Sequence, residues 1–216
     1  MIRYRKRYWA IAGGLSAVAG FLDAAAFMKL GGFFVSFMSG NSTRLGVGLS
    51  GVLSHAMVAG ALIATFVAGV AIGSAIPRSP RDEVAHTRVL WFVATLLVLA
   101  ALLSHGGYDV PAIGLIAMAM GAENATFERD GEVSIGLTYM TGTLVKFGQR
   151  LSAALRGVGP AWGWAPYLVL WLGMLAGAVA GAASYLAIGL GAIWIAAGAM
   201  LVLALALGRL EAQNRA

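Results

Sequence analysis

The feature that most constrains the fold of this chain is a series of apolar runs, each long enough to cross a lipid bilayer. A helix needs about 20 apolar residues to span the hydrocarbon core of a membrane. One such run, 8–28, contains a single acidic residue, Asp23. The other runs lie at 51–76, 88–104, 109–127, 161–186 and 188–208. We therefore expect an all-α, polytopic membrane protein with only short segments between its helices.

The composition also indicates a chain that is surrounded mostly by lipid. Of its 216 residues, 60% are hydrophobic and 11% are charged, whereas soluble domains carry about a quarter charged residues. The chain has no cysteine, which excludes disulfides and thiolate metal sites. We interpret its net charge of +6 as basic residues that flank membrane helices on the cytoplasmic side, and we expect no nucleic-acid partner.

A polar, glycine-centred phrase occurs twice in this apolar chain. SFMSGNSTRLG occupies 36–46, and TYMTGTLVKFG occupies 138–148, 102 positions later. A weaker match comes before each copy, because GFLDAAAF (from residue 20) resembles GAENATF (from residue 121) and aligns Asp23 with Asn124. We interpret the chain as one integral membrane domain made of two repeats.

The distribution of basic residues predicts how these repeats sit in the membrane. If both phrase segments re-enter without crossing, 13 of the 15 Lys and Arg residues lie on the cytoplasmic side, whereas 10 do if both cross. The positive-inside rule favours re-entry, with six full spans and both termini cytoplasmic. Three spans per repeat then give two inverted 3+3 repeats, whose interface near the bilayer midplane is where such folds bind solutes. The predicted repeats are 1–105 (spans 8–28, 51–76 and 88–104, re-entrant motif 31–50) and 106–216 (spans 109–127, 161–186 and 188–208, re-entrant motif 131–150).

Each phrase also has the composition of a helix start inside the membrane. A β-prone stretch comes first, FFVSF at 33–37 and EVSIGLTY at 132–139, and Ser or Thr then stands where a cap is favoured. We expect an extended strand, a glycine turn and a half-helix that begins at Ser39 or Thr141. Its unpaired first-turn amides suit an anion or a carbonyl-bearing solute, unless the small residues serve only to pack helices together. The expected substrate-binding residues are Ser39, Gly40, Asn41, Thr141, Gly142, Thr143 and Asn124.

The ionisable residues in or beside the spans are further candidates. Asp23 lies deep in the first span, where such a residue usually faces the protein interior or a watery path. It is a coupling or substrate residue, a structural partner of Lys29 or Arg44, or the N-cap of a half-helix. Glu123 is a second candidate coupling residue; the alternative is that it simply reaches water, because it is expected near the cytoplasmic end of its helix. Arg44 and Lys146 are either charge partners for an anion or lipid phosphate, or ordinary interface cations.

The pattern GFLDAAAF…GGFFVSFMSGNSTRLG, followed by GAENATF…TYMTGTLVKFG, resembles the YoaK family of bacterial membrane proteins, a group of unknown function designated DUF1275. The resemblance covers essentially the whole chain. It departs from the family pattern at Glu123, where a Gln is expected. The resemblance implies a multi-pass protein of the bacterial inner membrane and says little about a substrate.

Together these features predict a small secondary transporter or exporter of a small polar or anionic solute, proton-coupled through Asp23. The alternative is a non-transporting structural or accessory protein that binds lipid or partner membrane proteins. We expect membrane lipid, a small solute and further copies of the chain in a homo-oligomer as partners. No catalytic residue, cofactor or metal site is expected, because no catalytic motif occurs and the histidines at 55, 86 and 105 are scattered.

Overall fold

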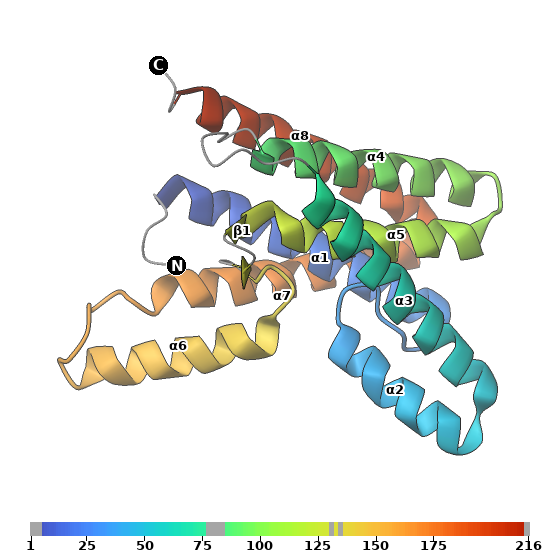
Figure 1. Ribbon diagram of the computed structural model, residues 1–216, viewed down its shortest axis with the longest axis horizontal. Coiled ribbons are helices and arrows are strands. Elements are labelled where there is room, and N and C mark those ends of the chain that lie inside the picture. The colour runs from blue at the N-terminus through green and yellow to red at the C-terminus, as the bar shows by residue number, and fades with distance from the viewer. Residues whose placement is uncertain (1–5, 77–84, 130–131, 134–135, 214–216) are drawn as a thin grey trace.

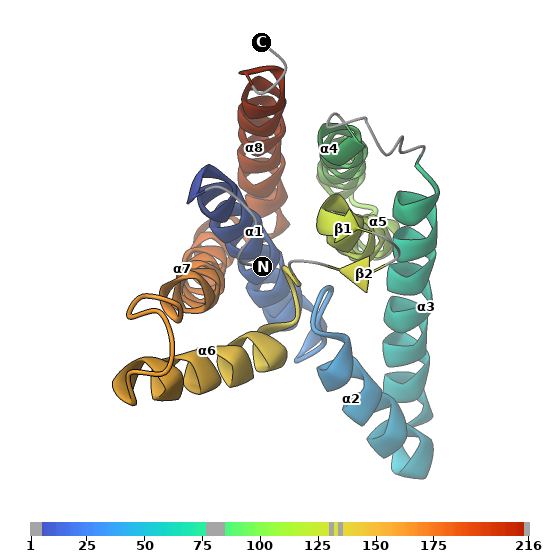
Figure 2. The same ribbon diagram turned by 60° about the vertical axis from the view of Figure 1, so that its left-hand side comes forward.

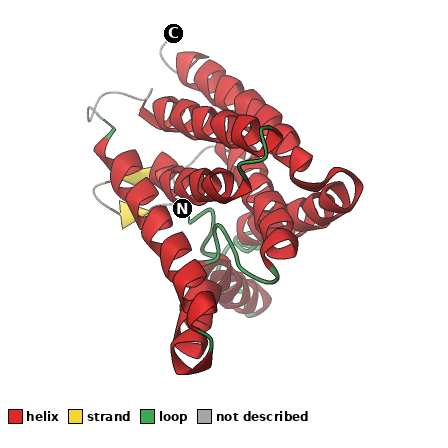
Figure 3. Ribbon diagram, turned by 90° about the vertical axis from the view of Figure 1, so that its right-hand side faces the viewer, coloured by secondary structure: helices red, strands yellow, loops and turns green. Residues whose placement is uncertain are grey.

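The part of the chain that the structure describes is almost entirely helical, as predicted (Figures 1 and 3). The computed structural model describes residues 6–76, 85–129, 132–133 and 136–213. Its α-helices are α1 (Lys6–Leu30), α2 (Met38–Gly51), α3 (Leu53–Ala75), α4 (Ala85–His105), α5 (Asp109–Glu123), α6 (Met140–Leu155), α7 (Ala165–Ile188) and α8 (Ile193–Gln213). Shorter elements are the 3-10 helices η1 (Asn124–Phe127) and η2 (Gly189–Ala192), and the antiparallel two-residue strands β1 (Glu128–Arg129) and β2 (Glu132–Val133).

Five helical segments of the described residues are long and apolar enough to cross a membrane. They are Trp9–Leu30, Leu53–Ala75, His86–His105, Asp109–Phe127 and Ala165–Gln213. The last is 49 residues long and contains both α7 and α8, with η2 between them. In the most apolar part of α1, 72% of the residues are buried, whereas in that of α3 only 28% are buried. Helix α1 is therefore a central helix, and α3 leaves most of its apolar side chains on the outer surface.

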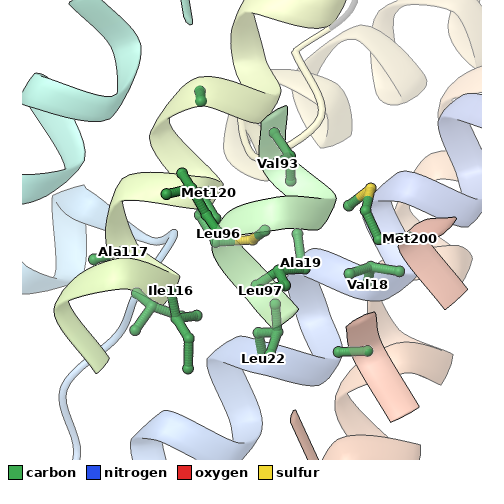
Figure 4. Close-up of a cluster of buried hydrophobic side chains, with 14 of the residues drawn as sticks. Val18, Ala19, Leu22, Val93, Leu96, Leu97, Ile116, Ala117, Met120 and Met200 are labelled. Atoms are coloured by element: carbon green, nitrogen blue, oxygen red, sulfur yellow. The ribbon is translucent and has the colours of Figure 1, made fainter. Parts of the chain in front are cut away.

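The apolar core lies where α1, α4, α5 and α8 meet (Figure 4). Three of these helices each contribute side chains at spacings of one, three and four residues, which lie on a single face of a helix. These sets are Val18, Ala19 and Leu22 on α1, Val93, Leu96 and Leu97 on α4, and Ile116, Ala117 and Met120 on α5. Met200 of α8 closes the cluster and is completely buried. The core thus joins helices from the first and the last part of the sequence.

Two helix crossings, α3 on α5 and α7 on α1, are built from matching glycine contacts. A Cβ atom on Gly69 of α3 would lie 2.0 Å from the carbonyl oxygen of Met118, and one on Gly177 of α7 would lie 1.9 Å from that of Ala17. Only glycine permits backbones to approach this closely. Two further pairs of contacts correspond in the same way. The contact of Gly73 with Ala122 corresponds to that of Gly181 with Phe21, and the contact of Gly121 with Phe66 corresponds to that of Gly20 with Met174. In all three pairs the partners on α3 and α7 are 108 positions apart, and those on α1 and α5 are 101 apart.

Helices α2 and α6 begin at the centre of the molecule and leave it in opposite directions. Gly31 and Gly32, with φ of 66° and 111°, turn the chain back after α1, because positive φ is readily adopted by glycine. The loop 31–37 then leads to α2. In Figure 1, α2 runs from the centre to one end of the long axis and α6 runs to the other end, and Figure 2 also shows both N-terminal ends near the centre.

The predicted strand before each of these helices is wrong in detail. Residues 33–37 form no strand, and in the second stretch only Glu132–Val133 is a strand, with 134–135 outside the described residues. The predicted helix starts are also one residue late. The helices begin at Met38 and Met140, after Phe37 and Tyr139, and neither of these preceding residues makes a side-chain cap bond. Residues 33–37 form no strand because side-chain oxygens, and not a neighbouring strand, accept hydrogen bonds from the backbone amides of this loop.

Candidate functional site

Asp23 of α1 holds the loop that leads into α2. One of its carboxylate oxygens, Oδ1, accepts hydrogen bonds from the backbone amides of Val35 (2.8 Å) and Ser36 (2.7 Å). The other oxygen, Oδ2, accepts the Ser36 hydroxyl at 2.6 Å. All three residues are buried. The carboxyl group therefore accepts the hydrogen bonds that a neighbouring strand would otherwise accept from this loop. The loop is irregular for this reason, and the same hydrogen bonds hold it in place.

The second copy of the phrase has an equivalent anchor. The hydroxyl of Thr138 donates to Oδ1 of Asn124 at 3.0 Å, as that of Ser36 donates to Asp23. The amide of Asn124 also donates to the carbonyl of Met120 at 2.9 Å. Helices α2 and α6 are thus each preceded by a hydroxyl that bonds to an acid or amide earlier in the chain, Asp23 within α1 and Asn124 directly after α5. The match between the two repeats aligned Asp23 with Asn124 and Ser36 with Thr138, but it did not predict the hydrogen bond within each copy.

Asn41 and Thr143, which occupy equivalent places in the two phrases, are buried rather than available to a solute. Asn41 is completely buried and bonds through both ends of its amide to the backbone of Phe34, accepting from its N–H at 3.0 Å and donating to its C=O at 2.7 Å. Thr143 is 3% exposed. Both side chains face inward from the first turn of their helices. Their geometry indicates that they fix the helix starts.

Among the predicted substrate-binding residues, the polar side chains that are exposed are those of Ser39 and Thr141, one on each helix. Both are exposed, as is Gly142, and Gly40 is half-buried. They lie in the first turns of α2 and α6, where amides have no carbonyl one turn earlier to bind. Each helix start therefore presents a hydroxyl and unpaired amide donors, a combination that suits negative charge.

Ser16, which the sequence reasoning missed, ties the second loop to α1. Its hydroxyl is buried and lies 3.3 Å from the carbonyl oxygen of Leu137 and 3.1 Å from that of Leu170. Ser16 is seven residues after the start of the apolar segment Trp9–Leu30, and Asp23 is seven residues before its end. The two loops therefore contact the middle of α1 about 10 Å apart along its axis. A hydroxyl inside an apolar run was the signal that could have identified Ser16.

The basic residues have other partners than those expected. Lys29 forms an ion pair of 2.6 Å with Asp109, at the start of α5, so the alternative that pairs Asp23 with Lys29 is wrong. The guanidinium of Arg44 lies 5.0 Å from the centre of the Phe33 ring, a cation–π geometry. Lys146 is exposed on α6. The role of Arg44 and Lys146 toward an anion remains a prediction.

Glu123 differs most from what the sequence suggested. The alternative that this residue reaches water is wrong, because it is completely buried. Neither of its carboxyl oxygens has a hydrogen-bond partner among the residues that the structure describes. The two acids thus have opposite surroundings, since Asp23 accepts hydrogen bonds at both oxygens and Glu123 at neither. Burial arises because α5 ends inside the bundle and η1 continues under α4.

A cavity of about 400 Å³ lies away from both phrases. It is found where α1 and α4 end and α5 begins, and it contains the Lys29–Asp109 ion pair. Tyr185 and Trp194 supply aromatic walls, and none of the residues predicted to bind a substrate lines it. The predicted site and this cavity are therefore separate features of the molecule.

Comparison with known proteins connects this architecture to a family. Residues 11–206 match the model of a family described as a protein of unknown function, DUF1275. A transmembrane protein of Rhizobium meliloti (strain 1021), RA0705 of the UPF0700 group, is 39% identical over 195 residues, which cover 90% of this chain and 83% of the relative. The UPF0700 transmembrane protein YoaK of Bacillus subtilis (strain 168) is 27% identical over 65% of this chain and 66% of its own length. No solved structure matches the chain. This chain belongs to the DUF1275 family, as its duplicated phrases indicated.

Proposed function

We propose that the chain is a small secondary transporter of a small polar or anionic solute. The observation that carries this proposal is the matched anchoring of two half-helices. Asp23 holds Ser36 before α2, and Asn124 holds Thr138 before α6. Irregular backbone at membrane depth is tolerated only where it is buried in protein or lines a watery cavity, and two helix starts fixed by buried polar side chains at the centre of the molecule fit a substrate site there.

We infer that the two repeats are inverted, with six full spans in a bacterial inner membrane and both termini cytoplasmic. The constant separations of the glycine contacts support a duplicated helix crossing, and the opposite directions of α2 and α6 in Figure 1 support inversion. The excess of basic residues on one side supports the orientation. In such folds the solute lies between the repeats and access alternates between the two faces.

The solute would lie between the two helix starts. Ser39 and Thr141 offer exposed hydroxyls there, and the amides of Gly40 and Gly142 offer donors at the positive ends of two helix dipoles. Asn41, Thr143 and Asn124 would keep these donors in position instead of touching the solute. Donors outnumber acceptors at this place, which favours an anion or a carbonyl-bearing solute.

A ligand screen with matched variants tests this site. Thermal unfolding of the purified protein would be followed with sulfate, uracil and tetraethylammonium as probes of three solute classes. We expect sulfate or uracil to stabilise the chain, and the variants Ser39→Ala and Thr141→Val to lose that shift. Ser42→Ala is the control, because Ser42 is exposed one turn further along α2 and its hydroxyl bonds only to the carbonyl of Met38. Equal shifts of the unfolding temperature in all variants, or no uptake of the stabilising solute into proteoliposomes, would favour the alternative of a non-transporting structural or accessory protein.

Inversion is tested separately by labelling from each side of the membrane. The chain has no cysteine, so Ser50→Cys near the end of α2 and Ser152→Cys near the end of α6 would be unique thiols. Both positions are exposed, and they are 102 residues apart, as the phrases are. We expect a membrane-impermeant maleimide to reach the first thiol only from outside and the second only from the cytoplasm. Labelling of both from one side would refute the inverted arrangement.

A further inference from the structure

Glu123 has surroundings that packing of the fold does not explain. Its side chain is completely buried at the last residue of α5. Within the described ranges, both carboxyl oxygens are without a hydrogen-bond partner. Buried polar groups are nearly always hydrogen-bonded, and an unpaired buried charge is far more costly than an unpaired dipole. An acid at this position therefore requires something to bind to its carboxyl group.

Comparison of the repeats indicates that the fold itself does not require an acid here. The separation of 101 that relates α1 to α5 aligns Glu123 with Leu22. Leu22 is 2% exposed and belongs to the apolar core (Figure 4). The equivalent position is thus filled by an apolar side chain of similar size in one repeat. Packing accounts for a leucine at this position, and the carboxyl group of Glu123 is what remains to be explained.

We propose that Glu123 is a proton-binding site and that it, rather than Asp23, carries the proton that couples solute movement. The coupling step rests on the proposed transport function, whereas proton binding does not. A proton neutralises the carboxyl group and needs no further ligands, whereas a metal cation would need several oxygen atoms around it. The carboxyl group of Asp23, by contrast, already has three hydrogen-bond donors.

Polar groups lead from Glu123 toward the end of the bundle where α4 begins. The hydroxyl of Thr126, three residues further along the chain, is buried and has no hydrogen-bond partner in the described part of the structure. The carbonyl of Thr126 is bonded by the ring of His86, which is half-buried at the start of α4. A titratable side chain on α4, that of His86, thus contacts η1, the 3-10 helix that follows Glu123.

Infrared spectroscopy of the full chain in lipid nanodiscs tests proton binding directly. We expect a carbonyl stretching band of a protonated carboxyl group at neutral pH, which Glu123→Gln removes and Asp23→Asn retains. Glu123→Leu provides a second variant, because Leu22 fills the equivalent position, and we expect it to unfold at or above the temperature of the natural chain. A spectrum that is the same with and without Glu123 would overturn the proposal. Loss of the band on addition of Na⁺ but not K⁺ would also overturn it, in favour of a metal-cation site.

Chemical labelling separates this inference from the transport proposal. Dicyclohexylcarbodiimide adds to protonated carboxyl groups in apolar surroundings, and we expect a modified peptide at Glu123 and none at Asp23. This result requires no solute. A chain that is labelled at Glu123 but moves no solute would contradict the transport function alone. Solute uptake that is unchanged in Glu123→Gln would contradict the coupling role alone, and labelling at Asp23 instead would overturn the assignment of the proton to Glu123.

Discussion

Replacement of Asp23 by Ala and by Asn separates the hydrogen bonds of this residue from its charge. Ala leaves three buried donors without an acceptor: the amides of Val35 and Ser36 and the hydroxyl of Ser36. Hydrogen bonds within membrane proteins contribute about 0.6–1.7 kcal/mol each, so we expect Asp23→Ala to lower the free energy of unfolding by about 2–5 kcal/mol. Asn keeps an oxygen for both amides, and its NH₂ group can donate to the Ser36 hydroxyl. We therefore expect Asp23→Asn to cost less than about 1 kcal/mol.

The measurement is unfolding of both variants in mixed micelles of increasing SDS content, followed by tryptophan fluorescence and circular dichroism. Asn124 provides the internal precedent, because an amide at the equivalent position accepts the hydroxyl of Thr138. Equal destabilisation by Ala and Asn would refute the reasoning, since the negative charge and not the set of acceptors would then hold the loop. Stability of Asp23→Ala near that of the natural chain would show that the loop is held by other contacts.

Two further substitutions test the packing and the surface electrostatics. Gly177→Ala would put a Cβ atom 1.9 Å from the carbonyl oxygen of Ala17, and we expect it to lower the free energy of unfolding in SDS by about 1–3 kcal/mol. The control is Gly198→Ala, where a Cβ meets no atom within 4 Å, and we expect it to raise that free energy by up to about 1 kcal/mol through helix propensity. Equal effects of the two substitutions would contradict the close crossing. The side chains of the Lys29–Asp109 pair are about one-third exposed. We therefore expect a double-mutant cycle to give a coupling energy below about 1 kcal/mol that decreases with added salt. A larger coupling energy that does not depend on salt would show that the cavity desolvates the pair.

The helices were predictable from the sequence because an apolar run of bilayer length has few alternatives to a helix. The loops before α2 and α6 were not. FFVSF has high β-propensity, but a strand needs a partner, and the amides of Val35 and Ser36 instead find the carboxylate of Asp23, twelve and thirteen residues earlier. Propensity describes a residue on a pleated surface, so it cannot identify a side chain on a neighbouring helix as the acceptor.

The candidate site was predictable in its location along the sequence but not in the direction of its side chains. The repeated phrase identified the first turns of α2 and α6, yet Asn41 faces inward to Phe34 while Ser39 is exposed. Adjacent residues in a helix point in different directions, and only the packed structure decides which of them is buried. The glycine crossings were hidden for another reason. Small residues are common throughout these helices, so a repeat at a separation of 108 is not distinctive in the sequence.

The separation between matching residues differs along the chain, which indicates where the two halves differ in the length of their connections. The first helices of the two units are related by 101 residues, the phrases by 102 and the third helices by 108. A single residue, Val52, joins α2 to α3, whereas residues 156–164 join α6 to α7, so the largest change falls in a connection outside the packed helices. The contacts that hold helices together have kept their spacing through these changes. Against a scaffold so evenly repeated, a difference between equivalent buried positions is informative, because packing would accept the same residue in both. Leu22 and Glu123 are such a pair, which is why the acid in the second unit is better explained by what it binds than by what it packs against.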